Sequence, residues 1–306
     1  MATLFDTFSF TGSAPGPRLL ILGAVHGNET CGAVAIQRLL KELASGEVLI
    51  QAGQLTLVPV TNKLAFDRKQ RAGDRNLNRN LQPNAHPQDN EDRIANELCP
   101  LLEANEVLLD LHSFHSPGQP FVMVGPGNNT DPLQPFAHAS EEEALARSLG
   151  VTRAVDGWLE TYARGATRRG DRVEYGVGTT EYMRARGGYG VTLECGQHED
   201  PSAPEVAYAA IRNCLAHLRM VDAPAPPAQQ METLRLVEVV DKNQPGDRFA
   251  QPWNSFDPWS AGQLVGWRQD GAEVHSSAAG HVVFPHAAAD PGTEWFYFAV
   301  RAPRFS

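Results

Sequence analysis

The chain has 306 residues, of which 42% are hydrophobic, and its formal net charge at pH 7 is −10. This length predicts one large or two modest globular domains, and the acidic balance argues against a nucleic-acid partner, because basic surfaces hold phosphate backbones. No apolar run approaches the roughly 18 residues that span a membrane, the N-terminus lacks signal-peptide features, and the four cysteines are scattered, so we expect a cytoplasmic protein with reduced thiols and no membrane contact.

Strands and helices alternate along the first two-thirds of the chain. The apolar pattern predicts a strand at residues 18–24, a helix over 29–44, a strand at 54–60, a helix over 89–104, and strands at 107–111 and 121–124. A capping-box signature of Ser140 and Glu143 then predicts a helix that ends at Gly150. A strand at 191–194 and a helix over 204–220 follow. This alternation predicts an α/β layered domain.

The composition changes after residue 221. Residues 222–230 are rich in Pro and Ala, which is typical of an extended linker. Short β-like runs follow at 234–240, 282–284 and 295–300, with no helical period between them. We therefore predict an α/β domain over 1–221, a linker over 222–230 and a small all-β domain over 231–306.

Two histidines and a glutamate stand at predicted strand ends. His26 and Glu29 lie where a strand gives way to a helix, and His112 ends a later strand. Two imidazoles and a carboxylate suit zinc with one open coordination position, and ligands gather at the carboxyl ends of strands in open α/β sheets. Each residue also has an ordinary explanation, such as a helix-start Glu or a core His. His115 is an alternative to His112 as the metal ligand. We prefer His112, because it follows the buried strand directly.

A further carboxylate and a basic segment complete the predicted site. Glu194 ends a short apolar strand, where a carboxylate is costly to bury without a partner. Beside a metal it could serve as a general base for water, although pairing with a nearby Arg is the plainer alternative. Arg71, Asn78 and Arg79 could grip an anionic substrate, and the alternative for them is a solvated basic loop.

These pieces, in this order, resemble the aspartoacylase/succinylglutamate desuccinylase family of the zinc carboxypeptidase superfamily. The motifs that carry the resemblance are His26-Gly27-Asn28-Glu29, Arg71, Asn78-Arg79, Asp110-Leu111-His112 and Glu194. Residues 280–285 and 291–298 are similar to the family's C-terminal β domain. The resemblance covers nearly the whole chain. It implies a zinc-carboxypeptidase-like mixed sheet flanked by helices, with a small C-terminal all-β domain, and makes residues 1–221 the zinc-dependent catalytic domain.

The resemblance also implies an activity and a role for each residue. It implies a zinc-dependent amidohydrolase, with one Zn²⁺ per chain, that removes the acyl group from a small anionic N-acyl amino acid. His26, Glu29 and His112 would ligate zinc, and Arg71 would polarise the scissile carbonyl. Glu194 would deprotonate the zinc-bound water and later pass the proton to the leaving amine. The substrate's carboxylates would be bound by Asn78, Arg79 and Arg184, and Arg186 competes with Arg184.

One position departs from the family's pattern. The family usually has Asp-Leu-Asn-Arg, whereas this chain has Asn76-Leu77-Asn78-Arg79. The usual Asp orients a zinc-ligating imidazole, and Asn76 can accept the same hydrogen bond only without charge. We therefore expect a less basic ligand and weaker metal affinity, unless Asp74 compensates.

Two other functions stay open at this stage. A zinc carboxypeptidase acting on a peptide C-terminus would use the same zinc, base and carboxylate-binding residues. An inactive zinc-binding homologue belongs to a different class, and bound zinc without hydrolysis of any amide would identify it. The sequence names neither the acyl group nor the amino acid, and it leaves open whether the protein is a homo-oligomer.

Overall fold

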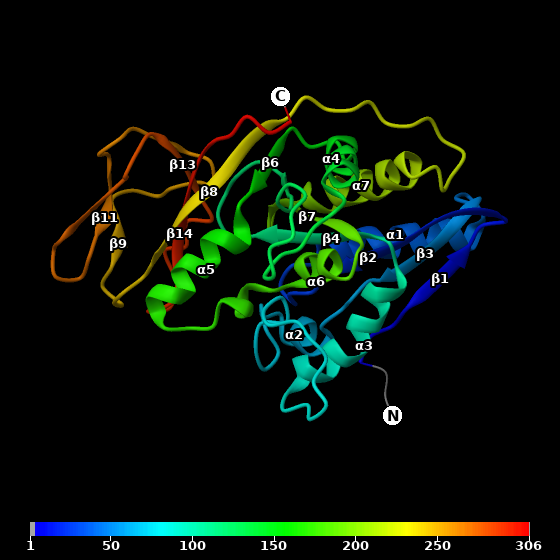
Figure 1. Ribbon diagram of the computed structural model, residues 1–306, viewed down its shortest axis with the longest axis horizontal. Helices are drawn as coiled ribbons and strands as arrows, with labels where there is room; N and C mark the ends of the chain where they lie inside the picture. The colour runs from blue at the N-terminus through cyan, green and yellow to red at the C-terminus, as the bar shows by residue number, and fades with distance from the viewer. Residues whose placement is uncertain (1–3, 306) are drawn as a thin grey trace.

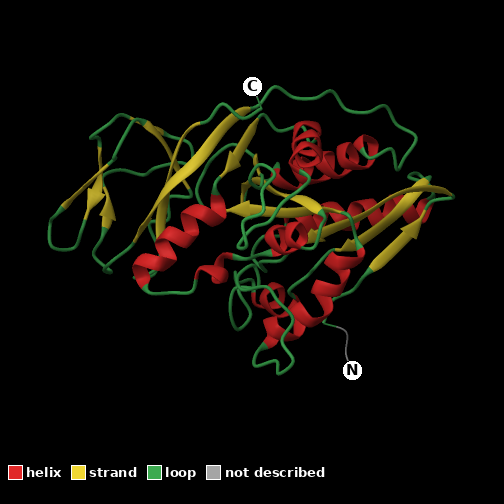
Figure 2. Cartoon of the chain, in the orientation of Figure 1, coloured by secondary structure: helices red, strands yellow, loops and turns green. Residues whose placement is uncertain are grey.

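The computed structural model describes residues 4–305, and its centre is one large mixed sheet flanked by helices (Figures 1 and 2). The strands of this sheet are β1 (Phe8–Thr11), β2 (Ala14–Gly23), β3 (Ala52–Val58), β4 (Val107–Phe114), β5 (Phe121–Met123), β6 (Arg153–Asp156), β7 (Tyr189–Gln197), β8 (Glu232–Asp241), β10 (Pro258–Trp259), β13 (Gly280–Val283) and β14 (Glu294–Arg301). Their order is β1-β3-β2-β4-β7-β5-β6-β8-β14-β13-β10, and the sheet has 11 strands. A 3-stranded sheet, at the far left in Figure 1, contains β9 (Arg248–Phe249), β11 (Leu264–Trp267) and β12 (Glu273–His275).

The helices cover both faces of the parallel part of the large sheet. They are α1 (Cys31–Ser45), α2 (Lys63–Arg68), α3 (Asn90–Ala104), α4 (Ala139–Ser148), α5 (Trp158–Arg169), α6 (Thr179–Ala185) and α7 (Ala203–His217), with a 3₁₀ turn, η1, at Val173–Gly176. Leu19 and Ile21 of β2 pack in one cluster with α1, α4 and α7, whereas Leu20 and Leu22 pack in another with α3 and α6. Because both faces are buried, the strand reads as a continuous apolar run rather than an alternating one.

The sheet changes character along its width. β2 pairs in parallel with β3 and β4, and β4 pairs in parallel with β7. β5 is antiparallel to β7, β6 pairs in parallel with β5 and β8, and β8, β14, β13 and β10 continue the sheet as antiparallel neighbours. The parallel centre brings the carboxyl ends of β2, β4 and β7 to one edge, which is where the predicted site residues lie.

The predicted fold class is confirmed: a mixed sheet flanked by helices, with additional antiparallel strands. The strands and helices predicted at 18–24, 29–44, 54–60, 89–104 and 107–111 are all present, with ends shifted by a few residues. The domain boundaries stay a prediction. In the structure, β8 follows the Pro/Ala segment and pairs with β6, so the backbone ladder runs across that segment.

The predicted capping box at Ser140 and Glu143 is wrong. α4 begins at Ala139, and its N-cap is His138, whose side chain makes no capping hydrogen bond. The reason is tertiary: the side chain of Asn128, from the preceding loop, accepts a hydrogen bond from the backbone N–H of Ala139 at 2.8 Å. The helix end near Gly150 is confirmed, because this residue follows the C-cap with a φ of +95°.

Two other expectations concern membranes and thiols. Within residues 4–305, no helix is both long and apolar enough to cross a membrane. All four cysteines are buried and free. Burial, together with the neighbouring Cys31, raises the pKa of the Cys195 thiol well above its usual value. Cys195 is therefore a packed thiol.

Candidate metal centre and active site

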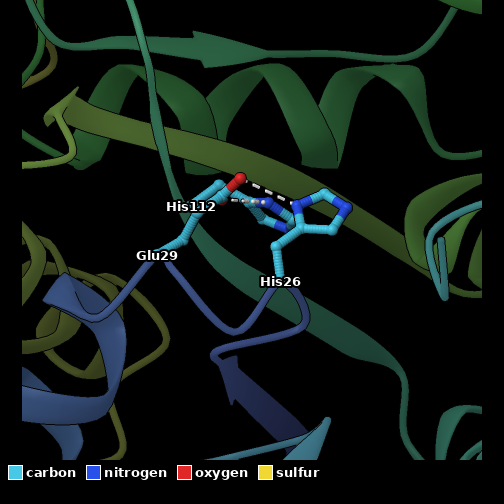
Figure 3. Close-up of side chains that lie close together, drawn as sticks. All are labelled: His26, Glu29 and His112. Atoms are coloured by element: carbon cyan, nitrogen blue, oxygen red, sulfur yellow. Dashed lines mark hydrogen bonds and ion pairs between the residues drawn. The ribbon is translucent and has the colours of Figure 1, made fainter. Parts of the chain in front are cut away.

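Three predicted ligands come together at the carboxyl ends of β2 and β4 (Figure 3). His26 and Glu29 lie on the loop between β2 and α1, and His112 lies on β4. The carboxylate of Glu29 spans the two rings: its Oε1 is 2.8 Å from Nδ1 of His26, and its Oε2 is 2.8 Å from Nδ1 of His112. One ligand atom from each residue lies within 4.8 Å of the other two. All three side chains are buried, so the group is held rigidly.

The loop that carries two of these ligands can pass only because of one glycine. A Cβ added to Gly27 would lie 2.0 Å from the carbonyl carbon of Ala65 in α2. The loop backbone therefore packs directly against α2, and no larger residue fits there without moving one of them. This close approach fixes His26 and Glu29 over the end of β2.

The outer nitrogens of both rings lie close to oxygen atoms. Nε2 of His26 hydrogen-bonds to Oδ1 of Asn76 at 2.9 Å, whereas Nε2 of His112 makes an ion-pair contact of 3.0 Å with the carboxylate of Asp110 that lacks hydrogen-bond geometry. An acceptor at Nε2 favours the tautomer whose proton is on Nε2, which leaves the Nδ1 lone pair free for a cation. Asp74 does not take over the role of Asn76, because its carboxylate accepts from the backbone N–H of Asn90 and lies 4.0 Å from Arg68.

The electrostatics of this group suit a cation. Burial alone would lower the pKa of His112, but the charges of Asp110 and Glu29 outweigh it and raise that pKa well above its usual value. Burial and the charge of Arg71 lower the pKa of His26 to about 4. The buried carboxylates thus stabilise positive charge between the rings. Two imidazole nitrogens and one carboxylate are also the donor set of a catalytic zinc site, so the residues fit a zinc ion.

Glu194 lies beside the three ligands without a partner of its own. It is on β7, in register with His112 of β4, and is only 7% exposed. Among residues 4–305, nothing forms a hydrogen bond with its Oε2. Burial and the negative charge of Glu29 raise the pKa of Glu194 to about 8. A buried, unpartnered carboxylate with a raised pKa is suited to taking up a proton near neutral pH.

A cavity of about 330 Å³ opens over this centre. The predicted site residues that line it are His26, Arg71, Asn78, Arg79, His112, Arg184 and Glu194. Glu29 is not among the lining residues and lies behind the two imidazoles. Residues beyond the Pro/Ala segment supply part of the wall: Phe284 and His286, which follow β13, and Glu294 and Tyr297 of β14. The cavity is therefore built from both ends of the chain.

The basic segment between the ligands is ordered rather than freely solvated. Arg71 is half exposed, and its Nη1 lies 2.7 Å from Oε1 of Glu29. The guanidinium of Arg79 lies 4.8 Å from the ring centre of Trp158. Asn78 accepts a hydrogen bond from the backbone N–H of Thr179 at 2.8 Å. Stacking and hydrogen bonds thus hold both guanidinium groups at the cavity wall.

The two competing arginines separate clearly. Arg184 is buried and lines the cavity, whereas Arg186 is half exposed and pairs with Glu103 at 3.3 Å. Arg184 is the residue in position to meet a substrate. Its guanidinium already pairs with Glu142 at 2.8 Å and with Glu181 at 3.4 Å. Its predicted role in binding a second carboxylate stays a prediction, and its partners argue against that role.

The competing histidine, His115, is held away from the three ligands. Its Nε2 lies 3.0 Å from the carbonyl oxygen of Pro285, and its ring centre is 4.1 Å from that of His286. Among the described residues, the group able to hold a metal consists of His26, Glu29 and His112. No local pattern around His115 could predict this difference, because Pro285 and His286 are remote in the chain.

Several lining residues were not predicted as site residues from the sequence. Ser113 and His198 hydrogen-bond to each other at 2.9 Å. The hydroxyl of Tyr297 is buried and forms no hydrogen bond within the described part of the chain. Trp158 and Glu294 complete this wall. The fold brings α5 and β14 together, because both lie against β8.

A second run of arginines, on and after α5, does not line the cavity. These side chains form ion pairs elsewhere: Arg164 with Glu160, Arg169 with Asp171 and Asp241, and Arg172 with Glu174. The arginines that line the cavity are Arg71, Arg79 and Arg184, and the last of these is paired with two buried carboxylates.

Residues 15–124 match the model of the family described as Succinylglutamate desuccinylase/Aspartoacylase catalytic domain. The matched segment contains the three candidate ligands and the Arg71–Arg79 loop, whereas Glu194 and Arg184 lie outside it. No curated protein is similar enough to match the chain.

Solved structures share the fold over almost the whole chain. One is a succinylglutamate desuccinylase/aspartoacylase from Rhodobacter sphaeroides, with a TM-score of 0.75 and 18% identity over 97% of this chain and 90% of that one. Another is the product-bound ectoine utilization protein EutE (DoeB) from Ruegeria pomeroyi, with a TM-score of 0.72 and 20% identity over 96% and 88%. A third is an aspartoacylase family protein from Mesorhizobium loti, with a TM-score of 0.69 and 21% identity over 98% and 90%. At these identities the likeness shows the fold.

Proposed function

We propose that the chain is a zinc-dependent deacylase of small N-acyl amino acids, because residues 15–124 match the Succinylglutamate desuccinylase/Aspartoacylase catalytic domain model. One observation carries the proposal: His26, Glu29 and His112 converge under one cavity beside the buried Glu194, whose Oε2 has no hydrogen-bond partner among the described residues. Two arginines of the same cavity wall supply charge for an anionic substrate. The cytoplasmic location stays a prediction from the sequence.

The three converging side chains would hold one zinc ion per chain. Two imidazole nitrogens and a carboxylate leave a coordination position open. A zinc ion bound there would supply a Lewis acid that lowers the pKa of water and polarises a carbonyl group. Asn76 and Asp110 would orient the two rings through their Nε2 atoms.

Glu194 would move the protons of the reaction. It would take a proton from the attacking water as the oxygen bonds to the acyl carbon. It would then donate that proton to the amine nitrogen as the carbon–nitrogen bond breaks, which yields a carboxylate and a free amino acid. Its pKa of about 8 before any cation binds reflects a site that holds a proton readily, and a neighbouring cation would lower that pKa.

The arginines would position the substrate. Arg71 would stabilise the negative charge that develops on the acyl oxygen, at the expense of its contact with Glu29. Asn78 and Arg79 would hold the α-carboxylate, and the Trp158 ring under Arg79 fixes that guanidinium in place. A cavity of about 330 Å³ with walls from two parts of the chain favours a small substrate over a long peptide.

A hydrolysis screen with defined variants tests the proposal. Zinc-loaded protein is assayed on N-acyl amino acids and on dipeptides, the latter to detect a carboxypeptidase. We expect Glu194→Gln to keep its zinc and to lose about 10²-fold or more in kcat. Glu199→Gln, an exposed position near the end of the same strand, is the matched control and should retain activity. A zinc-loaded wild type that cleaves nothing would identify an inactive homologue.

A further inference from the structure

The guanidinium of Arg184 has no spare charge for a substrate. Its Nε donates to Glu142 at 2.8 Å, its Nη1 to Glu181 at 3.4 Å, and its Nη2 to the carbonyl oxygen of Gly190 at 2.8 Å. Both carboxylates and the guanidinium itself are buried. Each face of the group therefore already contacts protein, and the charge is more than balanced.

Arg184 also cannot swing towards a ligand. A Cβ on Gly125 would lie 2.4 Å from its Nε, so the side chain lies flat on the backbone at this glycine. On another side, its guanidinium carbon is 5.5 Å from the ring centre of Phe136. The side chain links β5, α4, α6 and β7, and moving it would leave two buried carboxylates unpaired.

The region around Arg184 is thus negative overall. Two carboxylates face one guanidinium, which leaves an excess of one negative charge in a buried setting. Arg304, which also reaches Gly125, pairs with Glu143 at 2.8 Å and Asp156 at 3.2 Å and does not line the cavity. A substrate carboxylate placed here would add a third negative charge without a free cation to meet it.

The other wall of the cavity also suits a cation. Glu294 lines this wall, and its carboxylate is partly exposed. The guanidinium of Arg169 lies 3.8 Å from that carboxylate. The buried hydroxyl of Tyr297 has no partner among the described residues and can accept from an N–H donor.

We propose that the part of the cavity beside Arg184 and Glu181 receives a positively charged group of the substrate and rejects a second carboxylate. This inference rests on the proposed deacylase function and narrows its substrate class. The α-carboxylate still belongs to Asn78 and Arg79, so the preferred substrate carries a carboxylate at one end and an ammonium group at the other. The cationic group could sit on the amino acid or on the acyl part.

A charge series of similar length tests the side-chain arm. The kcat/KM values of the zinc-loaded protein are measured for Nα-acetylornithine, N-acetylglutamine and N-acetylglutamate. We expect the ornithine derivative to exceed the glutamate derivative by at least tenfold, with the glutamine derivative between them. Equal or higher activity on N-acetylglutamate would exclude a cationic side chain on the amino acid. The same result in the acyl series as well would overturn the inference while leaving the deacylase function intact.

A second series of substrates tests whether the cation lies on the acyl group. A binding measurement then separates this inference from the proposed deacylase function. N-acetylglycine, N-succinylglycine and N-β-alanylglycine share one amino acid and differ in the charge of the acyl group. A preference for a cationic substrate that is seen only in this series would place the cation on the acyl part. Calorimetric titration with ornithine and glutamate needs no hydrolysis. Tighter binding of ornithine would support the inference even in a protein that hydrolyses nothing, and binding of neither would overturn it.

Two variants assign the preference to named side chains. Glu181→Gln removes one negative charge while its amide oxygen can still accept from the backbone N–H of Gly178, as the carboxylate does at 3.0 Å. We expect the ornithine-to-glutamate ratio of kcat/KM to fall at least fivefold, whereas a purely structural role would lower both values together. Glu294→Gln tests the opposite wall if the first variant does not fold. Glu141→Gln, exposed on α4, is the control and should leave the ratio unchanged, and a ratio unmoved in both cavity variants would contradict the assignment.

Discussion

His26 is oriented by an amide where the family usually has a carboxylate. Oδ1 of Asn76 lies 2.9 Å from Nε2 of His26 and also accepts from the backbone N–H of Asn78 at 2.9 Å. An amide accepts these hydrogen bonds without adding negative charge, so His26 is a weaker base than it would be beside Asp. Oδ1 of Asn76 thus links the His26 ring to the loop that carries Asn78 and Arg79.

Replacing this amide should strengthen zinc binding. We expect Asn76→Asp to raise zinc affinity by about 10-fold or more, because a charged acceptor makes the imidazole a better donor to the cation. Competition with a chromophoric chelator measures the affinity. Asn80→Asp, on the same loop and bonded to Gln82, controls for added charge. An unchanged affinity in Asn76→Asp would remove the role assigned to Asn76.

His115 should make the fold sensitive to acid. Burial and the neighbouring His286 lower the pKa of His115 to about 4, whereas an unfolded His titrates near about 6.5. The unfolded chain therefore binds more protons between these values, so this contribution to stability is present above about pH 6.5 and is lost as the pH falls towards 4. Urea unfolding of wild type and His115→Gln at pH 7.5 and 5 should show a smaller loss in the variant. Equal losses would contradict this pKa.

At the scale of elements, one carboxylate of α3 fixes the loop between Arg71 and Arg79, two arginines that line the cavity. Glu91 is fully buried and accepts hydrogen bonds from the side chain of Asn62 at 2.8 Å and from the backbone N–H groups of Gly73, Asp74 and Arg75 at 3.0, 3.1 and 3.2 Å. With the side chain of Asn90 at 3.4 Å, five donors on one carboxylate hold a chain segment without regular structure in place.

Weakening this clamp should loosen substrate binding. In Glu91→Gln an amide replaces the charged acceptor, and we expect a loss of about 1–3 kcal/mol in the free energy of unfolding. KM should rise more than kcat falls, because the loop holds Arg79 whereas the metal ligands lie elsewhere. Denaturant titration and steady-state kinetics measure both quantities. Glu97→Gln, exposed on the same helix, should change neither, and a variant with unaltered KM would show that the loop is fixed by other contacts.

The long strands that are buried on both faces were predicted correctly from the sequence. β2 and β4 are covered on both faces, so their apolar runs were sufficient to predict them. β6 has 4 residues and α6 has 7, which is too short for a period to show in the sequence. The prediction of a capping box at Ser140 failed for another reason. The side chain of Asn128, from the preceding loop, accepts a hydrogen bond at the start of that helix.

At the scale of the whole molecule, the residues after the Pro/Ala segment are tied to those before it by a backbone ladder. β8 pairs in parallel with β6 and antiparallel with β14. Val155 of β6 packs in one buried cluster with Leu234 and Leu236 of β8. The two predicted domains thus share a sheet and a core cluster, and both line the cavity.

Truncation should therefore abolish folding rather than release an active domain. A fragment of residues 1–221 exposes the edge of β6 and the apolar face of its cluster, so we expect aggregation and no hydrolysis. Gel filtration and circular dichroism check this. Co-expression of residues 1–225 with 226–306, cut within the exposed segment, is the control and should restore a soluble, active complex. A monomeric, fully active 1–221 fragment would establish an independent catalytic domain.

The amino-acid sequence was sufficient to predict the fold class, the main strands and helices, and the three side chains that meet at the candidate metal centre. It was sufficient because buried strands have continuous apolar runs and because ligands follow the ends of such strands. Three-dimensional packing was needed to show that His115 bonds to the carbonyl oxygen of Pro285, that Arg184 rather than Arg186 lines the cavity, and that Glu142 and Glu181 balance the charge of Arg184. These outcomes depend on partners that are far apart in the chain, and the charge of a residue at a site is set by everything that packs around it.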